Sequence, residues 1–171
     1  MHWADFAAQT LSRRGSKHII ASGITPSGEF HIGHLREILT GDMVTKACIN
    51  AGLDAEFVFI VDSADPLRKV YPFLSDEYEK YIGCALATIP APDADGNPGN
   101  DGRTYAQHFL EPFLAALEQI DVRPRIIDNY TSYSNGEFAE RSKIACDKAA
   151  EIREIIERVS GRELAPNWFP F

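Results

Sequence analysis

The hydrophobic pattern along the chain predicts alternating strands and helices. Residues 18–23 form a short apolar run, and apolar residues then recur at helical spacing over 33–51, up to Gly52. Residues 56–61 form a nearly continuous apolar run that ends at Asp62, which is typical of a parallel strand buried on both faces. A strand, a helix and a strand within roughly 45 residues predict a βαβ unit.

The rest of the pattern predicts four further helices and one further strand. We expect the strand over 123–129 and the helices over 3–11, 76–85, 105–120 and 137–160. Ser75 is expected to cap the second of these helices and Gly161 to end the last and longest one. The side chains expected to face the core are Trp3, Phe6, Ala7 and Leu11 in the first helix, and Phe109, Phe113, Leu117 and Ile120 in the third.

These elements indicate an α/β fold, a Rossmann-like parallel sheet with flanking helices. A chain of 171 residues has the length of one domain, so we expect a single domain over 1–171. In such sheets ligands bind beyond the carboxyl ends of the strands. Residues 23–28 and 62–65 should therefore lie side by side.

Composition and charge narrow the class of protein. The hydrophobic share of 44% is ordinary for a globular protein, and no apolar run approaches the ~20 residues of a membrane span. The first residues do not resemble a secretory signal, and three widely spaced cysteines form no zinc set, so a cytoplasmic protein without a metal site is expected. The net charge of −8 argues against a domain that grips nucleic acid by itself.

The candidate chemistry lies in the turn between the first strand and the helix that follows. Unpaired N–H groups at a helix start, with no side chain on Gly28 or Gly33, allow a phosphate chain to lie close. His31 and His34 face the same side of the first helical turn. Two hydrogen-bond donors there suit the α-phosphate of a nucleotide during adenylyl transfer. The alternative is an ordinary turn with two surface histidines.

Several strings of the sequence resemble one enzyme family. His31-Ile32-Gly33-His34 matches the first signature of class I aminoacyl-tRNA synthetases. The wider pattern resembles the class I lysyl-tRNA synthetases of archaea and some bacteria, over about the first third of such an enzyme. The matching strings are residues 22–39, 2–5, 65–70 and 105–113.

The resemblance implies a HUP-type nucleotide-binding fold and a set of ligand contacts. It implies that ATP, with Mg²⁺, is bound by residues of the first turn and helix, with the two histidines as catalytic groups: Pro26, Gly28, His31, Gly33 and His34. The family's second histidine position is often Asn. The resemblance also implies that Gly23 and Thr25 belong to the lysine site.

An ammonium group also requires carboxylates in a partly dry pocket, and Asp62 and Asp65 follow the buried strand. The alternative is that Asp62 ends a strand and Asp65 caps the Asp-Pro turn. The family commonly has two adjacent carboxylates here, whereas this chain has Ser63, so one negative charge is missing. Arg68 and Lys69 are candidates for ATP phosphates or the tRNA acceptor end, or for ion pairs with nearby carboxylates.

The predicted function is a lysine–tRNA ligase that makes lysyl-adenylate from lysine and ATP and transfers lysine to tRNA(Lys). The family's second signature, its zinc-binding cysteines and its anticodon-reading domain have no counterpart in the sequence. We therefore expect residues 1–171 to be the N-terminal portion of the catalytic domain, either as a fragment or as a truncated homologue, poorly active alone, with tRNA contacts mainly elsewhere. Two alternatives are a small nucleotidyltransferase with the same histidine motif and a non-catalytic synthetase paralogue.

Overall fold

A computed structural model describes residues 2–170, and their contacts form two compact units. The first unit ends at Tyr130 and the second begins at Thr131. The sequence predicted one domain over 1–171, and the boundary falls just after the last strand. That these residues form the N-terminal portion of a larger catalytic domain stays a prediction.

The strands of the described chain form one parallel sheet in the order β1, β2, β3. These are β1 (Lys17–Ile24), β2 (Asp54–Val61) and β3 (Arg125–Asp128). β1 pairs with β2 along its whole length, and β3 pairs with the last four residues of β2, from Val58 to Val61. The sheet confirms the predicted parallel α/β fold and brings the carboxyl ends of all three strands to one edge.

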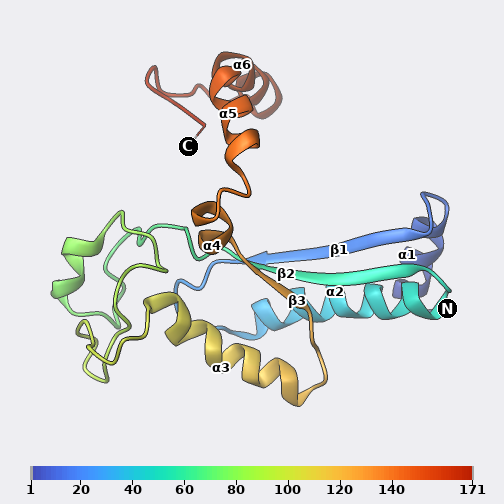
Figure 1. Ribbon diagram of the computed structural model, residues 1–171, viewed down its shortest axis with the longest axis horizontal. Helices are drawn as coiled ribbons and strands as arrows, with labels where there is room; N and C mark the ends of the chain where they lie inside the picture. Colours follow the sequence, from blue (N-terminus) through green and yellow to red (C-terminus); the bar gives the residue numbers. More distant parts are fainter. Residues whose placement is uncertain (1, 171) are drawn as a thin grey trace. The chain divides into compact units, whose positions relative to one another are not determined.

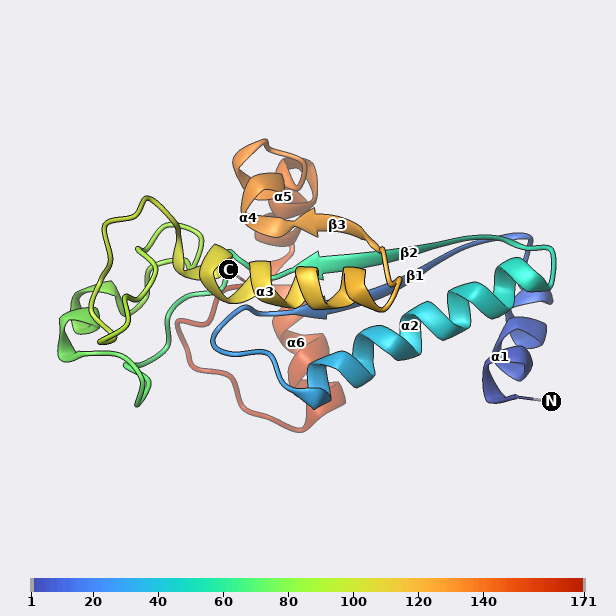
Figure 2. The ribbon, with the colours of Figure 1, turned by 90° about the horizontal axis from the view of Figure 1, so that it is seen from below.

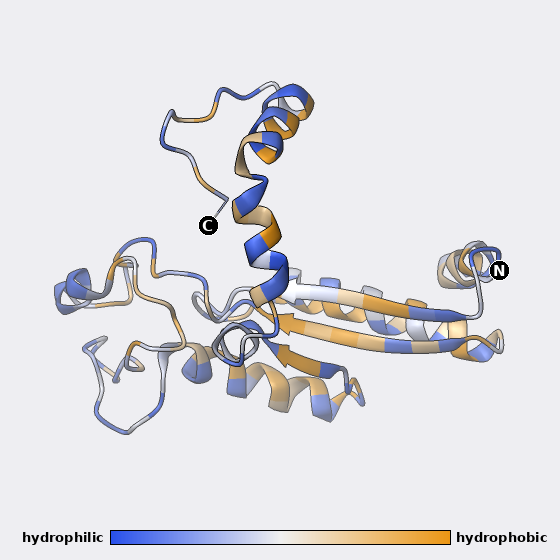
Figure 3. Cartoon of the chain, turned by 45° about the horizontal axis from the view of Figure 1, so that its top comes forward, coloured by the Kyte–Doolittle hydropathy of each residue, from blue (hydrophilic) through white to orange (hydrophobic). Residues whose placement is uncertain are grey.

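Two helices cover the same face of this sheet. Figures 1 and 2 show α2 (Ile32–Asn50) and α3 (Tyr105–Gln119) on one side of the strands. The apolar run of β2 is plain in Figure 3, with polar residues at its start. Its alternate side chains meet both helices in the main core, which includes Ile38, Phe57, Phe59, Val61, Phe113 and Leu117.

The helix α1 (Trp3–Ser12) packs on the last turns of α2. Its contact surface contains Ala4 and Ala8, which meet Ala47 and Cys48. The prediction that Trp3 and Phe6 face the core was wrong, since they are 48% and 66% exposed. Small side chains allow two helices to approach closely, so α1 buries its alanines and turns its large aromatic residues outward.

The segment between β2 and α3 builds a second core of its own. This core contains Leu67, Tyr78, Leu86 and Tyr105. The helix predicted over 76–85 is a shorter 3₁₀ helix, η1 (Asp76–Tyr81), and Ser75 makes no side-chain capping bond. Residues 89–103 form a loop without a helix or strand. The Tyr105 hydroxyl donates to Ser27 O at 2.8 Å and joins this layer to the turn after β1.

The second unit departs most from the sequence prediction. Instead of one helix over 137–160 it contains α5 (Ala139–Asp147) and α6 (Ala149–Ser160), interrupted at Lys148. Gly161 ends α6 in the left-handed conformation at φ 67°, as predicted. A further short helix, α4 (Asn129–Ser134), begins two residues before this unit and was not predicted, because Ser, Thr and Asn disfavour helix interiors.

Ile120 lies just after α3 and is largely exposed, so it does not belong to the core as predicted. Among the helices of residues 2–170, none combines the length and the apolar character needed to cross a membrane.

Candidate functional site

The predicted juxtaposition of the first two loops is confirmed. The Asp62 N–H donates to Ile24 O at 3.0 Å, which extends the pairing of β1 and β2 by one step. Thr25 Oγ1 donates to Asp65 Oδ2 at 2.7 Å across forty positions of the sequence. A Cβ built on Gly23 would lie 3.5 Å from Asp62 Oδ2, so the bare backbone of Gly23 leaves this carboxylate room.

The two histidines cap the start of α2 with their own rings. His31 Nδ1 accepts a hydrogen bond from Gly33 N–H at 3.1 Å, and His34 Nδ1 accepts one from His31 N–H at 3.1 Å. The rings stack with their centroids 3.9 Å apart. The reciprocal bonds satisfy backbone donors that a helix start otherwise leaves unpaired.

This capping fixes where the ring protons lie. A neutral imidazole has one donor nitrogen and one acceptor nitrogen. Because both Nδ1 atoms accept from the backbone, Nε2 carries the proton in each ring, and the bond made by one nitrogen sets the role of the other. His31 and His34 therefore each present an Nε2–H donor that the cap does not use.

The environment of His34 favours its neutral form. Partial burial lowers the pKa of His34 below its usual value, and the neighbouring His31 ring lowers it further, while Glu37 opposes both effects. The ring also contacts Phe30, which stacks on Phe113 of α3 with the centroids 4.2 Å apart. The Phe30 ring thus packs between His34 and Phe113 and connects the histidine pair to α3.

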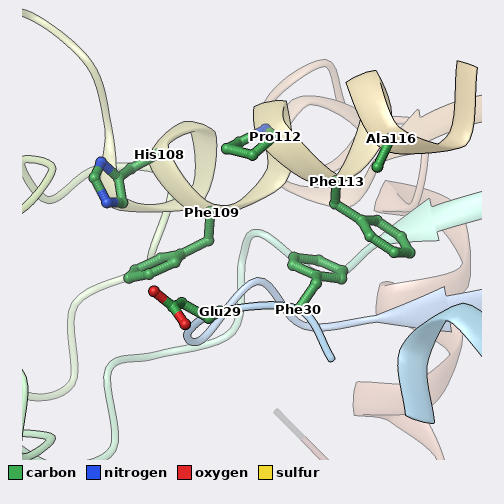
Figure 4. Close-up of a pocket in the computed structure, with 7 residues that line it drawn as sticks. All are labelled: Glu29, Phe30, His108, Phe109, Pro112, Phe113 and Ala116. Atoms are coloured by element: carbon green, nitrogen blue, oxygen red, sulfur yellow. The ribbon is translucent and has the colours of Figure 1, made fainter. Parts of the chain in front are cut away.

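A cavity of about 330 Å³ lies between α3 and the turn that carries the histidines. Figure 4 shows its lining, with Phe109, Pro112, Phe113 and Ala116 from α3 opposite Glu29 and Phe30 from the turn. The floor of this cavity is aromatic, and Glu29 and His108 add polar groups to it. The sequence did not predict it, because its two sides are about eighty residues apart in the chain.

The two predicted lysine-binding carboxylates lie beside each other at the end of β2. Burial raises the pKa of Asp62, and the carboxylate of Asp65 raises it further. Asp62 Oδ1 accepts a hydrogen bond from Asn129 Nδ2 at 2.9 Å. Two carboxylates that repel each other in a partly buried site attract a cation. Gly23, Thr25, Asp62 and Asp65 are thus brought together as a candidate cation site.

Ser63 is a buried structural residue in this chain. Only 1% of it is exposed, its Oγ donates to Asp128 Oδ2, and it accepts a hydrogen bond from Tyr130 N–H at 3.3 Å. A carboxylate at position 63 would therefore be buried against Asp128 and would not face an open ligand site. Asn129 also accepts from Ala64 N–H at 2.9 Å, so Ser63 and Ala64 bind the end of β3.

Sequence reasoning missed Asp128 and Asn129 as members of the site. The sequence did contain a signal for them. The predicted strand over 123–129 ends in polar residues, and parallel strands end at the same edge of a sheet, so these residues had to lie near Asp62. These residues provide the amide and carboxylate groups that surround Asp62 and Ser63.

The remaining predicted residues take different places. Gly28 lies against the Phe73 ring, because a Cβ on Gly28 would be 3.6 Å from two carbons of that ring. A Cβ on Gly33 would be 2.8 Å from the His31 ring. Pro26 is fully buried, so its side chain shapes the turn. Arg68 is exposed and approaches Asp65 Oδ2 at 3.6 Å, and the Lys69 ammonium lies 5.5 Å from the centroid of the Tyr71 ring.

The described residues were also searched for side chains that could bind a metal ion together. Within residues 2–170, no three His, Cys, Asp or Glu side chains are grouped so that they could hold a metal ion.

Fold and site together define a class of protein, an α/β nucleotide-binding domain in which a histidine pair caps the helix after the first strand. The chain belongs to the family described as tRNA synthetases class I (K), which matches residues 1–171.

Curated relatives match along the whole chain. It is 43% identical over 171 residues to the lysine–tRNA ligases of Methanosarcina barkeri and Archaeoglobus fulgidus, of which it covers 31% and 34%. It is 43% identical over 172 residues to the lysine–tRNA ligase of Methanocaldococcus jannaschii and covers 31% of that protein. The chain thus spans about a third of the length of these relatives.

Proposed function

We propose that the chain is the ATP- and lysine-binding part of a lysine–tRNA ligase. The proposal depends mainly on one observation. Thr25, Asp62 and Asp65 lie together at the edge of the sheet where the turn that carries the histidine pair begins. The names of the curated relatives support the amino acid and the reaction.

The proposed reaction has two steps. A carboxylate oxygen of lysine attacks the α-phosphorus of ATP, and pyrophosphate leaves with the electron pair of the broken P–O bond. A terminal ribose hydroxyl of tRNA then attacks the lysyl carbonyl carbon, loses its proton, and AMP leaves. Neither step requires a nucleophile from the protein, so positioning and charge stabilisation supply most of the rate.

The histidine pair is assigned to the α-phosphate. Its outward Nε2–H groups are donors whose direction is set before ATP binds, because the Nδ1 atoms are held by the backbone. Preorganised donors of this kind stabilise charge that develops in a transition state. Mg²⁺ is expected to arrive with ATP, held mostly by phosphate oxygens and water.

The carboxylate pair is assigned to the lysine ammonium. Burial raises the pKa of Asp62 most and repulsion by Asp65 raises it further, and an ammonium between the two carboxylates relieves this repulsion. Gly23 leaves the space beside Asp62 open, and the Thr25 hydroxyl holds Asp65 in place. With a net charge of −8, the chain is expected to leave most of the grip on tRNA to other parts of the enzyme.

The test is thermal stabilisation by non-hydrolysable aminoacyl-adenylate analogues, which requires no turnover. We expect the lysyl analogue to stabilise the chain, by about 2.7 kcal/mol at about 100 times its Kd, and the arginyl, glutamyl and cysteinyl analogues to give much smaller shifts. His34→Ala should lose the shift.

His18→Ala is the matched control, because His18 lies on β1 and bonds Gly15 O, away from the histidine pair. It should keep the shift produced by the lysyl analogue. Equal shifts with all four analogues, or a shift that survives His34→Ala, would contradict the assignment.

A further inference from the structure

Side-chain hydrogen bonds join the end of β3 to the loop that follows β2. Ser63 joins the two segments through its bonds to Asp128 and to the backbone of the residue after Asn129. Asn129, which is the first residue of α4, joins them through Asp62 and Ala64. Asn129 therefore connects β3 to one carboxylate of the candidate cation site.

The amide of Asn129 can bond to this loop in one orientation. Its Oδ1 accepts from the Ala64 N–H at 2.9 Å, and a backbone N–H can only donate. Its Nδ2 donates to Asp62 Oδ1 at 2.9 Å. If the amide were turned over, two donors would meet at Ala64 and two acceptors at Asp62. The backbone of Ala64 thus fixes Asn129 so that it presents a donor to Asp62.

The charged groups around Asp62 come from the loop itself and from β3. Asp65 follows Asp62 in the loop, and Arg68 approaches Asp65 Oδ2 at 3.6 Å with 72% of its side chain exposed. From β3, Asp128 bonds to Ser63, the neighbour of Asp62 in the chain. The carboxylates are partly enclosed, whereas water screens much of the charge of the guanidinium.

The donor from Asn129 acts against the groups that disfavour a charged Asp62. Burial raises the pKa of Asp62, and the Asp65 carboxylate raises it further. A hydrogen bond that is donated to a carboxylate stabilises the charged form. Asn129 therefore favours a charged Asp62 before any ligand binds.

The same bond fixes the direction of the Asp62 carboxylate. Oδ1 accepts from Asn129, and the other oxygen, Oδ2, lies beside Gly23, where a built Cβ would be 3.5 Å away. Asp65 is held in a similar way by Thr25, whose hydroxyl donates to Asp65 Oδ2 at 2.7 Å. Each carboxylate of the pair is thus held by an uncharged donor from another segment of the chain.

We propose that Asn129 is a positioning residue for lysine recognition, whose amide keeps the Asp62 carboxylate charged and directed at the side-chain ammonium. The proposal rests on the proposed function, because it assumes that Asp62 and Asp65 bind this ammonium. Asn129 acts through Asp62, and it increases the preference for an ammonium over an uncharged side chain of the same length.

Two variants separate the donor of Asn129 from its size. Asn129→Asp keeps the size and the acceptor for the Ala64 N–H, but it turns a second acceptor toward Asp62. Asn129→Leu has a similar size and removes both bonds without adding charge. Asn100→Asp is the matched control, because Asn100 is exposed in the loop of residues 89–103.

The first measurement is the pKa of Asp62 by carbon-13 NMR of the carboxyl group, without ligand. We expect Asn129→Asp to raise the pKa by about one unit or more, and Asn129→Leu to raise it by less, because only the first adds a charge. Asn100→Asp should leave it unchanged. Melting temperatures within a few degrees of the wild type will show that the variants are folded. An unchanged pKa of Asp62 in folded Asn129→Leu would overturn the proposal.

The second measurement is the affinity for two non-hydrolysable aminoacyl-adenylate analogues by calorimetry. The lysyl analogue has the ammonium, and the norleucyl analogue lacks only this group. Asn129→Asp should weaken binding of the lysyl analogue about tenfold or more, and of the norleucyl analogue less than about twofold. A residue that only stabilises the loop would affect both analogues equally, so an equal loss would overturn the role of Asn129.

A double-mutant cycle tests whether Asn129 acts through Asp62. Asp62→Asn should itself remove most of the preference for the lysyl analogue. In that background Asn129→Asp should change the ratio of the two affinities less than about twofold, because the carboxylate that Asn129 positions is gone. A full tenfold change in the Asp62→Asn background would contradict the proposed route.

The outcomes distinguish the role of Asn129 from the proposed function. Equal binding of the two analogues by the wild-type chain, or binding of neither, would contradict the assignment of the carboxylate pair to lysine, and the role of Asn129 with it. A preference of the wild-type chain for the lysyl analogue that both Asn129 variants keep would contradict the role of Asn129 alone.

Discussion

His31 and His34 use one nitrogen of each ring to build the helix start and leave the other for a ligand. Gly33 makes this arrangement possible, because a Cβ there would lie 2.8 Å from the His31 ring. The glycine between the histidines is therefore required for the position of the first ring, and in the proposed function it also lets a phosphate lie close.

A pH titration tests this arrangement at His34. The pKa of His34 is lowered in the folded chain, so the unfolded chain binds more protons as the pH falls. The contribution of His34 to stability should be complete above about pH 6.5, the ordinary value for His, and should be lost as the pH falls below it. Urea unfolding from pH 8 to pH 5 measures this loss.

His34→Asn is the comparison, because its side-chain oxygen can accept from His31 N–H at any pH. The wild-type chain should lose more stability than this variant between pH 7 and pH 5. Parallel curves for the two proteins would show that the His34 ring does not act as a neutral cap.

At the scale of elements, the packing of α2 on β2 depends on one missing side chain. A Cβ on Gly41, in the middle of α2, would lie 2.4 Å from the Phe57 ring. Phe57 is almost fully buried in the main core, so its ring has little room to move. The helix and the strand can approach this closely only because position 41 has no side chain.

Gly41→Ala should therefore destabilise the chain, although alanine is the better helix former. Overpacking of a core costs about 1–3 kcal/mol, whereas the gain in helix propensity is about 1 kcal/mol. Thr40→Ala, at the exposed neighbouring position, is the control and should change stability little. The free energy of unfolding in urea measures both.

A double-mutant cycle with Phe57→Leu separates the clash from other causes. If the ring is responsible, Gly41→Ala should cost less in the Phe57→Leu background than in the wild type. An equal cost in both backgrounds would place the effect elsewhere.

Helices and strands could be predicted where their own residues carry the sequence signals that define them. The boundaries of β1, α2, β2 and α3 were predicted to within two residues, because each has an apolar period and a clear end signal. The interruption at Lys148 was missed, because a continuous helical pattern runs across it. The alanine face of α1 was missed because periodicity identifies apolar positions but not which of them another helix can approach.

At the scale of the whole molecule, burial is concentrated in the first unit. The three hydrophobic clusters of the described chain lie before Tyr130. Within α5 and α6, none of the residues is fully buried. The apolar contacts that resist opening thus belong to the sheet and to the helices that cover it.

Hydrogen exchange should show this difference directly. Amides of β2 and the middle of α2 should exchange at the rate of global unfolding, whereas amides of α5 and α6 should exchange at least about a hundredfold faster, through local opening. Mass spectrometry of peptides from 36–46, 54–61 and 139–160 measures all of these segments in one experiment. Equal protection would contradict the assignment of stability to the first unit.

The sequence alone determined the parallel α/β fold, the strand–turn–helix unit and the candidate residues that the first two loops bring together, but not Asp128 and Asn129. These follow from local periods, from glycine and proline at turns, and from the rule that parallel strands end at one edge. Only the tertiary structure decided which groups Ser63 and Asn129 contact. Their partners lie tens of residues away, and the choice between them depends on packing distances that no local pattern contains.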